Sequence, residues 1–374
     1  MSTLNTLEII FFLIFVFSFV IQMTYYLVFF SKLAFYSPEL KNTNQLPSIS
    51  VVIAARNEYQ QLKNNLPQIL NQNYPDFEVI VVNHASIDDT TSLLKELNIK
   101  YKNLKVIHIE KDLNFFHGKK FPLSIGIKSA QYDTLLLTDA DCQPASQQWI
   151  TNMASSFTGN TEVVLGYGPY ISQKGLLNKI IRYDTFLVAM QYLSYALAGK
   201  PYMGVGRNLS YKKNLFYKNK GFTSHYNISS GDDDLFISSV ANKKNTHIEL
   251  SSESFMYSKP KQTFKEWVTQ KKRHLSTGGS YPKKFKLLLG TYGASIILFY
   301  IFLVGISIIT KGILLWIVLG LWFLKWLIQF IIHKKILTIL KEKQLLLFSL
   351  IWEPVHALVL PFLIFGKKKK NKWK

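Results

Sequence analysis

Long apolar runs lie near both ends of the chain. One covers residues 7–30, and three follow late, at residues 287–310, 312–332 and 345–365. Runs of about 20 apolar residues are long enough to cross a bilayer as helices, and the first run is too long for a signal-peptide core. The pattern therefore predicts α-helical transmembrane segments at both ends of the chain.

The charges beside these runs predict an orientation. Lys32 and Lys41 follow the first run, whereas Glu8 is the only charge near its start. Because positive residues favour the cytoplasmic side, the N-terminus should lie outside and the following domain should lie in the cytoplasm. Two later crossings then return the chain to the cytoplasm near His333.

The last apolar run differs from the others. It contains Glu353, Pro354, His356 and Pro361, and a lysine-rich tail follows it at residues 367–374. A full crossing would place that tail outside, against the positive-inside rule. We therefore expect this run to be kinked, re-entrant or interfacial, with the tail inside.

Shorter apolar runs alternate with helical stretches between the two ends. The runs at residues 47–55, 77–82, 106–109 and 135–141 are typical of buried strands. Strands that alternate with helices predict a mostly parallel α/β sheet, whose ligands bind beyond the carboxyl ends of the strands. Polar side chains gather at those ends: Arg56, Asn57, Glu58, Asn83, His84, Lys119, Asp139 and Asp141.

Asp139 and Asp141 end the last of these strands with one residue between them. On an extended chain, residues i and i+2 point to the same side, so the two carboxylates can face one ligand. Such a pair favours a divalent metal, Mg²⁺ or Mn²⁺, completed by phosphate oxygens and water. A solvated turn is the alternative, and the other polar side chains at this edge favour the metal.

Composition separates two classes of partner. Lysine and arginine number 44 against 23 acidic residues, a net charge of +21, while 48% of the residues are hydrophobic. Nucleic-acid binding would explain the charge, but apolar runs with lysine clusters beside them favour an anionic membrane surface. The single cysteine, Cys142, excludes an internal disulfide and fits a reducing compartment.

Seven short motifs follow one another in a recognisable order. They read SVVIAARNE, EVIVVNHASIDDT, HGKKFPLSIGI, LLLTDADCQP, GVGRNLSYKKNLF, SGDDDLF and QKKRH. Over roughly residues 47–280 the chain resembles the family-2 glycosyltransferases, and its flanking apolar runs resemble membrane-bound members such as polysaccharide synthases and ceramide glucosyltransferases. The resemblance implies a GT-A, Rossmann-like nucleotide-sugar domain and an enzyme that inverts the anomeric centre of the sugar it transfers.

The resemblance also implies how the chain is divided. We expect an N-terminal transmembrane helix, a linker, a cytoplasmic catalytic domain, C-terminal membrane segments and a basic tail at residues 1–32, 33–46, 47–280, 281–366 and 367–374. The protein should be a multi-pass protein of the inner (cytoplasmic) membrane that contacts membrane lipids. Its partners should be a nucleotide-sugar donor and a lipid or lipid-linked acceptor, with no nucleic acid.

By resemblance, residues of four motifs bind the donor and its metal. Asp139 and Asp141 correspond to the family's metal-binding pair, and either Lys119 or Lys120 adds positive charge near the nucleotide. The family has an acidic pair where this chain has Asn83 and His84. Either side chain can bond a base edge, but neither replaces a carboxylate that accepts the N–H of uracil. The resemblance still favours a uridine donor, with guanosine and thymidine open. The implied donor-binding residues are Ala55, Asn57, Glu58, Asn83, His84, Lys119 and Asp139.

The later motifs resemble the acceptor side of the family. Asn208 lies in a glycine-rich loop, and Gln270, Arg273 and His274 share one helical face, all at acceptor- or diphosphate-binding positions. His274 stands where the family has Trp, which favours a single transfer over synthesis of a long polymer. The lysines nearby are predicted to form a basic collar against lipid headgroups: Lys271, Lys272, Lys283, Lys284 and Lys286.

Asp232, Asp233 and Asp234 form a second acidic cluster. Adjacent carboxylates repel one another, so at least one pKa should rise, which suits a general base for a sugar hydroxyl. Asp232 and Asp233 are both candidates for the base, and Asp234 is then expected to cap the following helix. The alternative for the whole chain is a non-catalytic membrane protein with a degenerate nucleotide- or glycan-binding domain, which the intact acidic motifs oppose.

Overall fold

A computed structural model of the protein describes residues 5–38, 46–110, 118–228 and 230–365, with side chains up to residue 358. The chain divides into two compact units, one of them Ser37–Ser280 and the other Met1–Tyr36 together with Tyr281–Lys367. Three stretches discussed above lie wholly or partly outside the described residues: the linker, the first residue of the motif HGKKFPLSIGI and the basic tail.

The Ser37–Ser280 unit is built on a seven-stranded sheet of order β3-β2-β1-β4-β7-β6-β8. Its strands are β1 (Ile49–Ala55), β2 (Phe77–His84), β3 (Leu104–Ile109), β4 (Thr134–Asp139), β6 (Val163–Leu165), β7 (Leu209–Lys212) and β8 (Thr246–Ile248). Only β7 runs antiparallel to its neighbours, so the mostly parallel GT-A-type sheet is confirmed. A separate antiparallel pair is formed by β5 (Cys142–Pro144) and β9 (Met256–Ser258).

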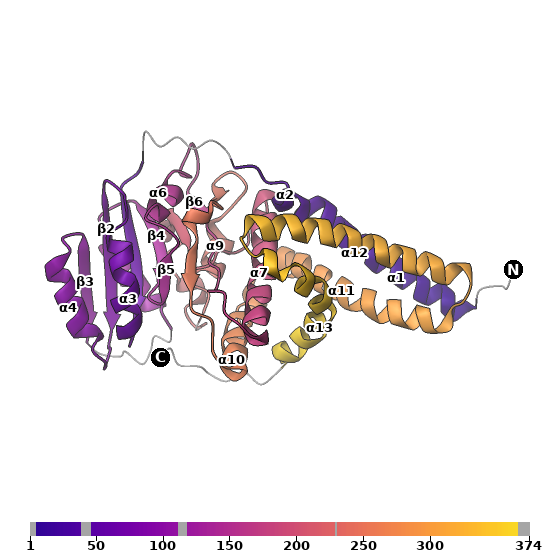
Figure 1. Ribbon diagram of the computed structural model, residues 1–374. Helices are drawn as coiled ribbons and strands as arrows, with labels where there is room; N and C mark the ends of the chain where they lie inside the picture. The colour runs from indigo at the N-terminus through magenta and orange to yellow at the C-terminus, as the bar shows by residue number, and fades with distance from the viewer. Residues whose placement is uncertain (1–4, 39–45, 111–117, 229, 366–374) are drawn as a thin grey trace. The chain divides into compact units, whose positions relative to one another are not determined.

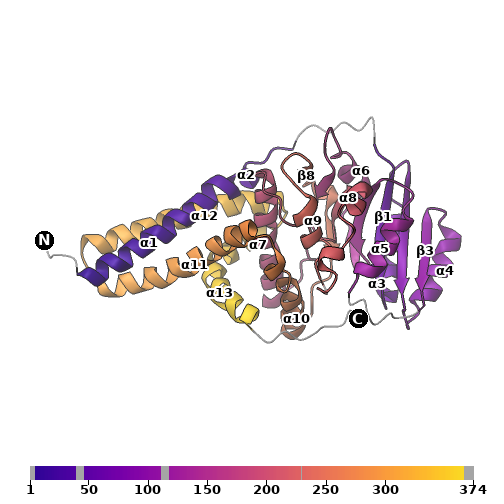
Figure 2. The same cartoon turned by 180° about the vertical axis from the view of Figure 1, so that it is seen from behind.

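Helices cover both faces of this sheet, so β1 is buried at every position. Alternate residues of β1, such as Val51 and Ile53, share a core with α3, α4 and α6. On the opposite face α5 packs so closely that a Cβ at Gly126 would lie 2.6 Å from Val52 Cγ1. Figure 1 shows α3 on the near side of the sheet, and Figure 2 shows α5 from behind. The helices are α3 (Tyr59–Leu70), α4 (Thr90–Lys100), α5 (Lys120–Ser129), α6 (Trp149–Ala154), α7 (Leu176–Leu197), α8 (Lys213–Lys218), α9 (Asp234–Val240) and α10 (Phe264–Leu275).

The other unit is helical. It contains α1 (Thr6–Thr24), the π-helical turn η1 (Tyr25–Phe30), α2 (Ser31–Ala34), α11 (Lys283–Ile309), α12 (Ile313–Ile339) and α13 (Leu346–Phe365). Among the residues that the structure describes, three stretches are long and apolar enough to cross a membrane: Thr6–Ala34, α11 and α12. These helices lie side by side in both views and share a core of Phe15, Phe299, Ile306 and Val318 (Figures 1 and 2). The apolar helices predicted at the two ends are therefore confirmed.

The last apolar run forms one helix, α13, of 20 residues. Its Glu353 is buried and forms an ion pair with Lys325 of α12. The Glu353 carboxylate also accepts hydrogen bonds from the hydroxyls of Tyr26 and Tyr300 at 3.1 and 2.7 Å, and Lys325 Nζ donates to Gln329 Oε1 at 2.6 Å. These partners explain how an apolar run accommodates a glutamate, because buried charges are tolerated when they are paired and hydrogen-bonded. Whether α13 crosses the membrane stays a prediction.

This ion pair makes a first prediction. Lys325→Met should destabilise the protein by about 3–5 kcal/mol, because it leaves the Glu353 carboxylate buried without its partner. The double variant Lys325→Met, Glu353→Met removes both charges and should recover most of that loss. Denaturant unfolding of the three proteins in one detergent measures the difference, and a single variant as stable as the wild type would contradict the pairing.

Candidate active site

The parallel strands bring three polar segments to one edge of the sheet. Their register places Ala55 beside Asn83 and Ala54 beside Asp139, so the chain leaves β1, β2 and β4 at the same level. His84 ends β2, and the segments that follow β1 and β4 carry Asn57, Glu58 and Asp141. The edge on which the sequence predicted a ligand site is therefore formed.

Asp139, Asp141 and Cys142 are placed so that they could hold a metal ion, because one donor atom of each lies within 4.8 Å of the others. Asp141 accepts hydrogen bonds from Ser258 Oγ at 3.2 Å and from the Cys142 thiol at 3.4 Å. A third carboxylate lies close: burial, followed by the charges of Asp141 and Asp139, raises the pKa of Glu58 to about 7. A divalent cation would relieve this repulsion, and a donor set rich in carboxylate oxygen fits Mg²⁺ or Mn²⁺.

Asp139 also has a cationic partner. Lys119 Nζ lies 2.8 Å from Asp139 Oδ1 and 3.1 Å from Asp232 Oδ2, so one ammonium group bridges carboxylates of two motifs. Burial opposes the charged form of Lys119, but Asp139, Asp232 and Asp233 outweigh it and hold its pKa well above the ordinary value. Burial would likewise raise the pKa of Asp139, and Lys119 instead keeps it below the ordinary range. Of the two lysines predicted near the nucleotide, Lys119 faces this edge, while Lys120 donates to backbone carbonyls elsewhere.

The three acidic residues of the second cluster have different partners. Asp232 is 3% exposed and forms the ion pair with Lys119. Asp233 accepts the backbone N–H of Gly206 at 2.7 Å and that of Asp234 at 2.8 Å. Burial raises the pKa of Asp233 to about 7, and the neighbouring Asp232 and Asp234 add to the shift. The Asp233 carboxylate is therefore held in place by two backbone N–H groups and has a pKa near 7.

Asp233, rather than Asp234, is the N-cap of α9, so the expectation that Asp234 caps this helix is wrong. Asp234 lies in the first turn, where one carboxylate oxygen accepts the Thr277 hydroxyl at 2.5 Å and the other accepts the Leu235 N–H at 2.7 Å. Thr277 lies just beyond α10, after the C-cap residue Ser276. Asp234 thus fastens the start of α9 to the end of the helix that carries Gln270.

A stacked arginine links α10 to the acidic edge. Gln270 Nε2 donates to the Tyr170 hydroxyl at 3.1 Å, and the Arg207 guanidinium lies over the Tyr170 ring with Cζ 4.3 Å from its centroid. Arg207 and Arg273 both add to the effect of Lys119 on the pKa of Asp139, against the effect of burial. The structure therefore places both guanidinium charges near the carboxylates of the candidate metal site. His274, on the same helix, is exposed.

Lys271 is an interior residue, and the prediction that it belongs to a lipid-facing collar is wrong. Its Nζ lies 2.5 Å from Asp184 Oδ1 on α7, and both side chains are largely buried. The pair holds α10 against α7, so it supports the position of Gln270 and Arg273. In the sequence Lys271 lies beside other basic residues, and its partner Asp184 is 87 positions away.

The loop predicted to contact the nucleotide base forms hydrogen bonds with neighbouring protein groups. Asn83 is buried; its amide donates to Thr91 Oγ1 at 2.9 Å and its carbonyl oxygen accepts the Ser86 hydroxyl at 2.6 Å. Ser86 Oγ in turn accepts the Asn57 N–H at 2.9 Å, which ties this loop to the segment after β1. His84 is buried beside the Phe121 ring. Neither predicted base-reading side chain is therefore presented at the surface.

Asn208 is not brought to the site. It is fully buried, where its carbonyl oxygen accepts the Trp149 indole N–H at 2.9 Å and its amide donates to the carbonyls of Tyr167 and Ser254 at 3.0 and 2.7 Å. These bonds use its polar atoms to hold three segments together. The residue before it, Arg207, reaches the acidic edge instead. Sequence reasoning missed Arg207, although an arginine inside a glycine-rich loop was the available signal.

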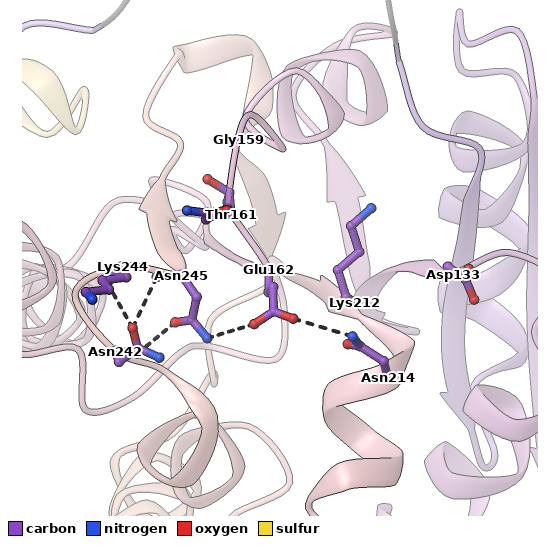
Figure 3. A pocket seen from close by; sticks show the side chains of 10 residues that line it. Asp133, Gly159, Thr161, Glu162, Lys212, Asn214, Asn242, Lys244 and Asn245 are labelled. Atoms are coloured by element: carbon purple, nitrogen blue, oxygen red, sulfur yellow. Dashed lines mark hydrogen bonds between the residues drawn. The ribbon is translucent and has the colours of Figure 1, made fainter.

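A polar hollow of about 720 Å³ lies away from the carboxylate edge (Figure 3). It is lined by Asp133, Gly159, Asn160, Thr161, Glu162, Lys212, Asn214, Asn242, Lys244 and Asn245. Asn245 donates to Glu162 at 3.2 Å, Asn214 donates to Glu162 at 3.4 Å, and Asn242 accepts the Lys244 N–H at 2.9 Å. Lining groups bond one another, and most of the lining residues precede β4, β6 or β8 rather than follow them, so we do not place the active site here.

Comparison with known proteins agrees with this geometry. Residues 139–365, more than half of the chain, match the family described as Glycosyl transferase family group 2, and residues 50–221 match Glycosyl transferase family 2. Glycosyltransferase AglE of Haloferax volcanii is 27% identical over 146 residues, which are 38% of this chain and 46% of that protein. Poly-beta-1,6-N-acetyl-D-glucosamine synthase of Staphylococcus epidermidis is 33% identical over 97 residues, 26% of this chain and 22% of that protein. The chain thus matches less than half the length of these relatives.

The fold has a counterpart among solved structures. The mannosyltransferase of Pyrobaculum calidifontis, in complex with GDP-Man and Mn²⁺, superimposes with a TM-score of 0.58 over 94% of this chain and 99% of that chain, at 16% identity. At this identity the likeness shows the fold alone. The family matches themselves show that the chain belongs to glycosyltransferase family 2.

Proposed function

We propose that this protein transfers a single sugar, with inversion, from a nucleotide-sugar to a lipid or lipid-linked acceptor. One observation carries the proposal: Lys119 contacts both Asp139 and Asp232, so the proposed metal-binding pair and the acidic cluster that contains the candidate base belong to one connected group of charges. A displacement at a sugar carbon needs this proximity, because the donor phosphates and the attacking hydroxyl flank the same atom.

In the proposed reaction Asp233 takes the proton of an acceptor hydroxyl. The hydroxyl oxygen forms a bond to the anomeric carbon while the bond from that carbon to the phosphate oxygen breaks, and the departing nucleoside diphosphate keeps the electron pair. Gly206 N–H and Asp234 N–H hold the Asp233 carboxylate in place. A pKa near 7 lets this carboxylate be ionised and still accept a proton.

Asp139, Asp141 and Glu58 would hold the divalent metal. When bound, Mg²⁺ or Mn²⁺ supplies positive charge against the charge that develops on the departing diphosphate. Lys119 adds a fixed positive charge beside Asp139. Cys142 lies within reach of the same position but is a soft donor, which these hard cations do not require.

Arg207 and Arg273 extend the proposed diphosphate site. Arg207 Nη1 and Arg273 Nε are buried and have no hydrogen-bond acceptor among the described residues. Guanidinium groups bind phosphate oxygens through several N–H donors. Tyr170, held by Gln270, supports the Arg207 plane from one side. We infer that these donors bind the diphosphate of the nucleotide-sugar.

Arg207→Met should therefore weaken binding of the released nucleoside diphosphate by roughly 10- to 100-fold, the loss expected for one charged hydrogen-bonding group. Affinity for the nucleoside without phosphates should stay unchanged. Tyr170→Phe keeps the ring under the guanidinium and serves as the matched control, with a smaller loss. Calorimetric titration in the presence of metal measures all three, and unchanged diphosphate affinity in Arg207→Met would remove Arg207 from the site.

The membrane setting supports a lipid or lipid-linked acceptor. Three described helices can cross a bilayer, and the lysines after the first apolar run favour a cytoplasmic face for the catalytic unit and the inner membrane as its location. Cysteines introduced near Lys63 of the otherwise single-cysteine chain should resist impermeant thiol reagents in intact cells. Ready labelling at this position would reverse the proposed orientation.

A screen of the purified full chain against nucleotide-sugars tests the proposed activity. Release of nucleoside diphosphate that depends on a membrane-lipid extract would support it and identify the donor. The buried Asn83 and His84 motivate one alternative, a non-catalytic protein that binds a nucleotide or glycan. Nucleotide binding with no release from any donor would favour that alternative.

A further inference from the structure

Lys120 is a buried lysine for which the proposed chemistry has no direct use. It is the first residue of α5 and is 1% exposed. Its Nζ donates to the backbone carbonyls of His225 at 2.6 Å and Ile228 at 2.8 Å. Burying an ammonium group is costly, and backbone carbonyls compensate for it less well than a carboxylate does. The function of Lys120 should therefore depend on the backbone segment that it binds.

The two carbonyls belong to the segment that leads into the second acidic cluster. Phe222 fixes the start of this segment by packing against Phe216 and Phe236, at centroid distances of 5.2 and 5.8 Å. Gly231 ends it with φ +99°, and a Cβ there would lie 2.7 Å from Leu235 Cδ1. Asp232 follows directly. A displacement of this segment would therefore move the acidic cluster.

Between these ends the described backbone bonds are local. His225 N–H donates to the Phe222 carbonyl and Ile228 N–H donates to the His225 carbonyl, both at 3.1 Å. These backbone bonds lie within the segment and give it its local shape. Lys120 reaches the segment from α5, a helix that packs on β1 and β2. It therefore attaches the segment to the rigid part of the fold.

Two successive lysines thus hold the cluster from two directions. Lys119 binds the Asp232 side chain, and Lys120 binds the backbone that precedes it. We propose that Lys120 is a positioning residue that sets the place of the Asp233 carboxylate by fastening residues 225–228 to α5. The inference rests on the proposed function of Asp233 as the base. Burial lowers the pKa of Lys120 to about 8 and the charges of Asp232, Asp234 and Asp233 oppose this, so the amine is still mostly protonated at neutral pH.

Lys120→Met in the full chain tests the inference. The rate constant kcat should fall by roughly 10²-fold, as for a catalytic group moved by about 1 Å, while donor affinity stays near the wild-type value because Lys119 and Asp139 are untouched. Amide hydrogen exchange in peptides covering residues 222–231 should accelerate. Lys120→Arg keeps the charge and its donors and should restore part of both losses.

Lys105→Met is the matched control. Lys105 Nζ also donates to a backbone carbonyl, that of Ser129 at the far end of α5, at 2.7 Å. Its replacement should change neither kcat nor exchange in residues 222–231. If Lys120→Met does not fold, Lys120→Gln, which keeps one neutral donor, should show a smaller loss of the same kind.

Unchanged exchange in residues 222–231 of a folded Lys120 variant would overturn the inference. A fall in donor affinity as large as the fall in kcat would overturn it too, because that pattern indicates general damage to the site. The exchange measurement needs no turnover. If Asp233→Asn retains normal transfer, the proposed base fails, while exchange still decides whether Lys120 fastens the segment.

Discussion

Asp233→Asn should lower the rate of sugar transfer by about 10²–10⁴-fold, the usual contribution of a general base, while the affinity for donor and metal persists. The replacement keeps an oxygen that can accept the Gly206 N–H, which now holds Asp233 at 2.7 Å. It removes the group that takes the proton. Transfer rate and donor affinity must be measured separately, because only their separation identifies a base.

The two neighbouring acids are the controls for this result. Asp232→Asn removes one of the carboxylates that Lys119 bridges, so we expect it to reduce donor affinity as well as rate. Asp234→Asn weakens the bond to Thr277 and should mainly cost stability, on the order of 1 kcal/mol. If all three variants keep near-normal transfer, the base lies elsewhere in the chain.

The pH dependence adds an independent readout for Asp233. Burial, reinforced by Asp232 and Asp234, raises the pKa of Asp233 to about 7. A base must be deprotonated to act, so kcat/KM of the wild type should fall as the pH drops below about 7 and level off above it. The residual activity of Asp233→Asn should lack this acidic limb. An unchanged limb in that variant would show that another group titrates.

Removal of divalent metal should abolish turnover, and Mg²⁺ or Mn²⁺ should restore it. Asp141→Asn should reduce transfer by roughly 10²–10³-fold, the cost of losing one preorganised electrostatic contact in the transition state. The fold should survive, because an asparagine oxygen can still accept the Ser258 hydroxyl that now lies 3.2 Å away. Full activity in excess chelator would refute the metal requirement.

The case for this metal depends on Asp141 and Glu58 more than the sequence suggested. Asp139 has Lys119 as a partner at 2.8 Å, so it does not need a cation for charge balance. Cys142→Ser is the matched variant for the third potential ligand. It should leave the affinity for Mn²⁺, measured by spectroscopic titration, close to the wild-type value if the ligands are carboxylates. A large loss would make the thiol a ligand.

The sequence by itself determined the architecture and the edge of the sheet at which the candidate site lies. Apolar runs of different length separated the membrane helices from the strands, because helix and strand periodicity and length are properties of neighbouring residues. The alternation of strands and helices then required parallel strands with their carboxyl ends at one edge. Asp139, Asp141 and Glu58 could be placed at one edge for that reason alone, without knowledge of any partner.

Only the tertiary structure decided which side chain does what within that edge. Lys119 and Lys120 are adjacent and chemically identical, yet one bridges two carboxylates and the other holds a distant segment of backbone. Asp233 and Asp234 differ in the same way. The partners of these four side chains are distant in the sequence, so tertiary packing decides which partner each side chain meets.

The same reason explains the residues that sequence reasoning misplaced. Asn208 lies in a glycine-rich loop, but its side chain is hydrogen-bonded to Trp149, Tyr167 and Ser254 in the core. Lys271 lies among surface lysines but finds Asp184 on α7. A local pattern records that a residue is polar, whereas its direction depends on which elements the fold packs against it. Burial then fixes the orientation of the side chain, because a polar group removed from water must form a hydrogen bond or ion pair inside the protein.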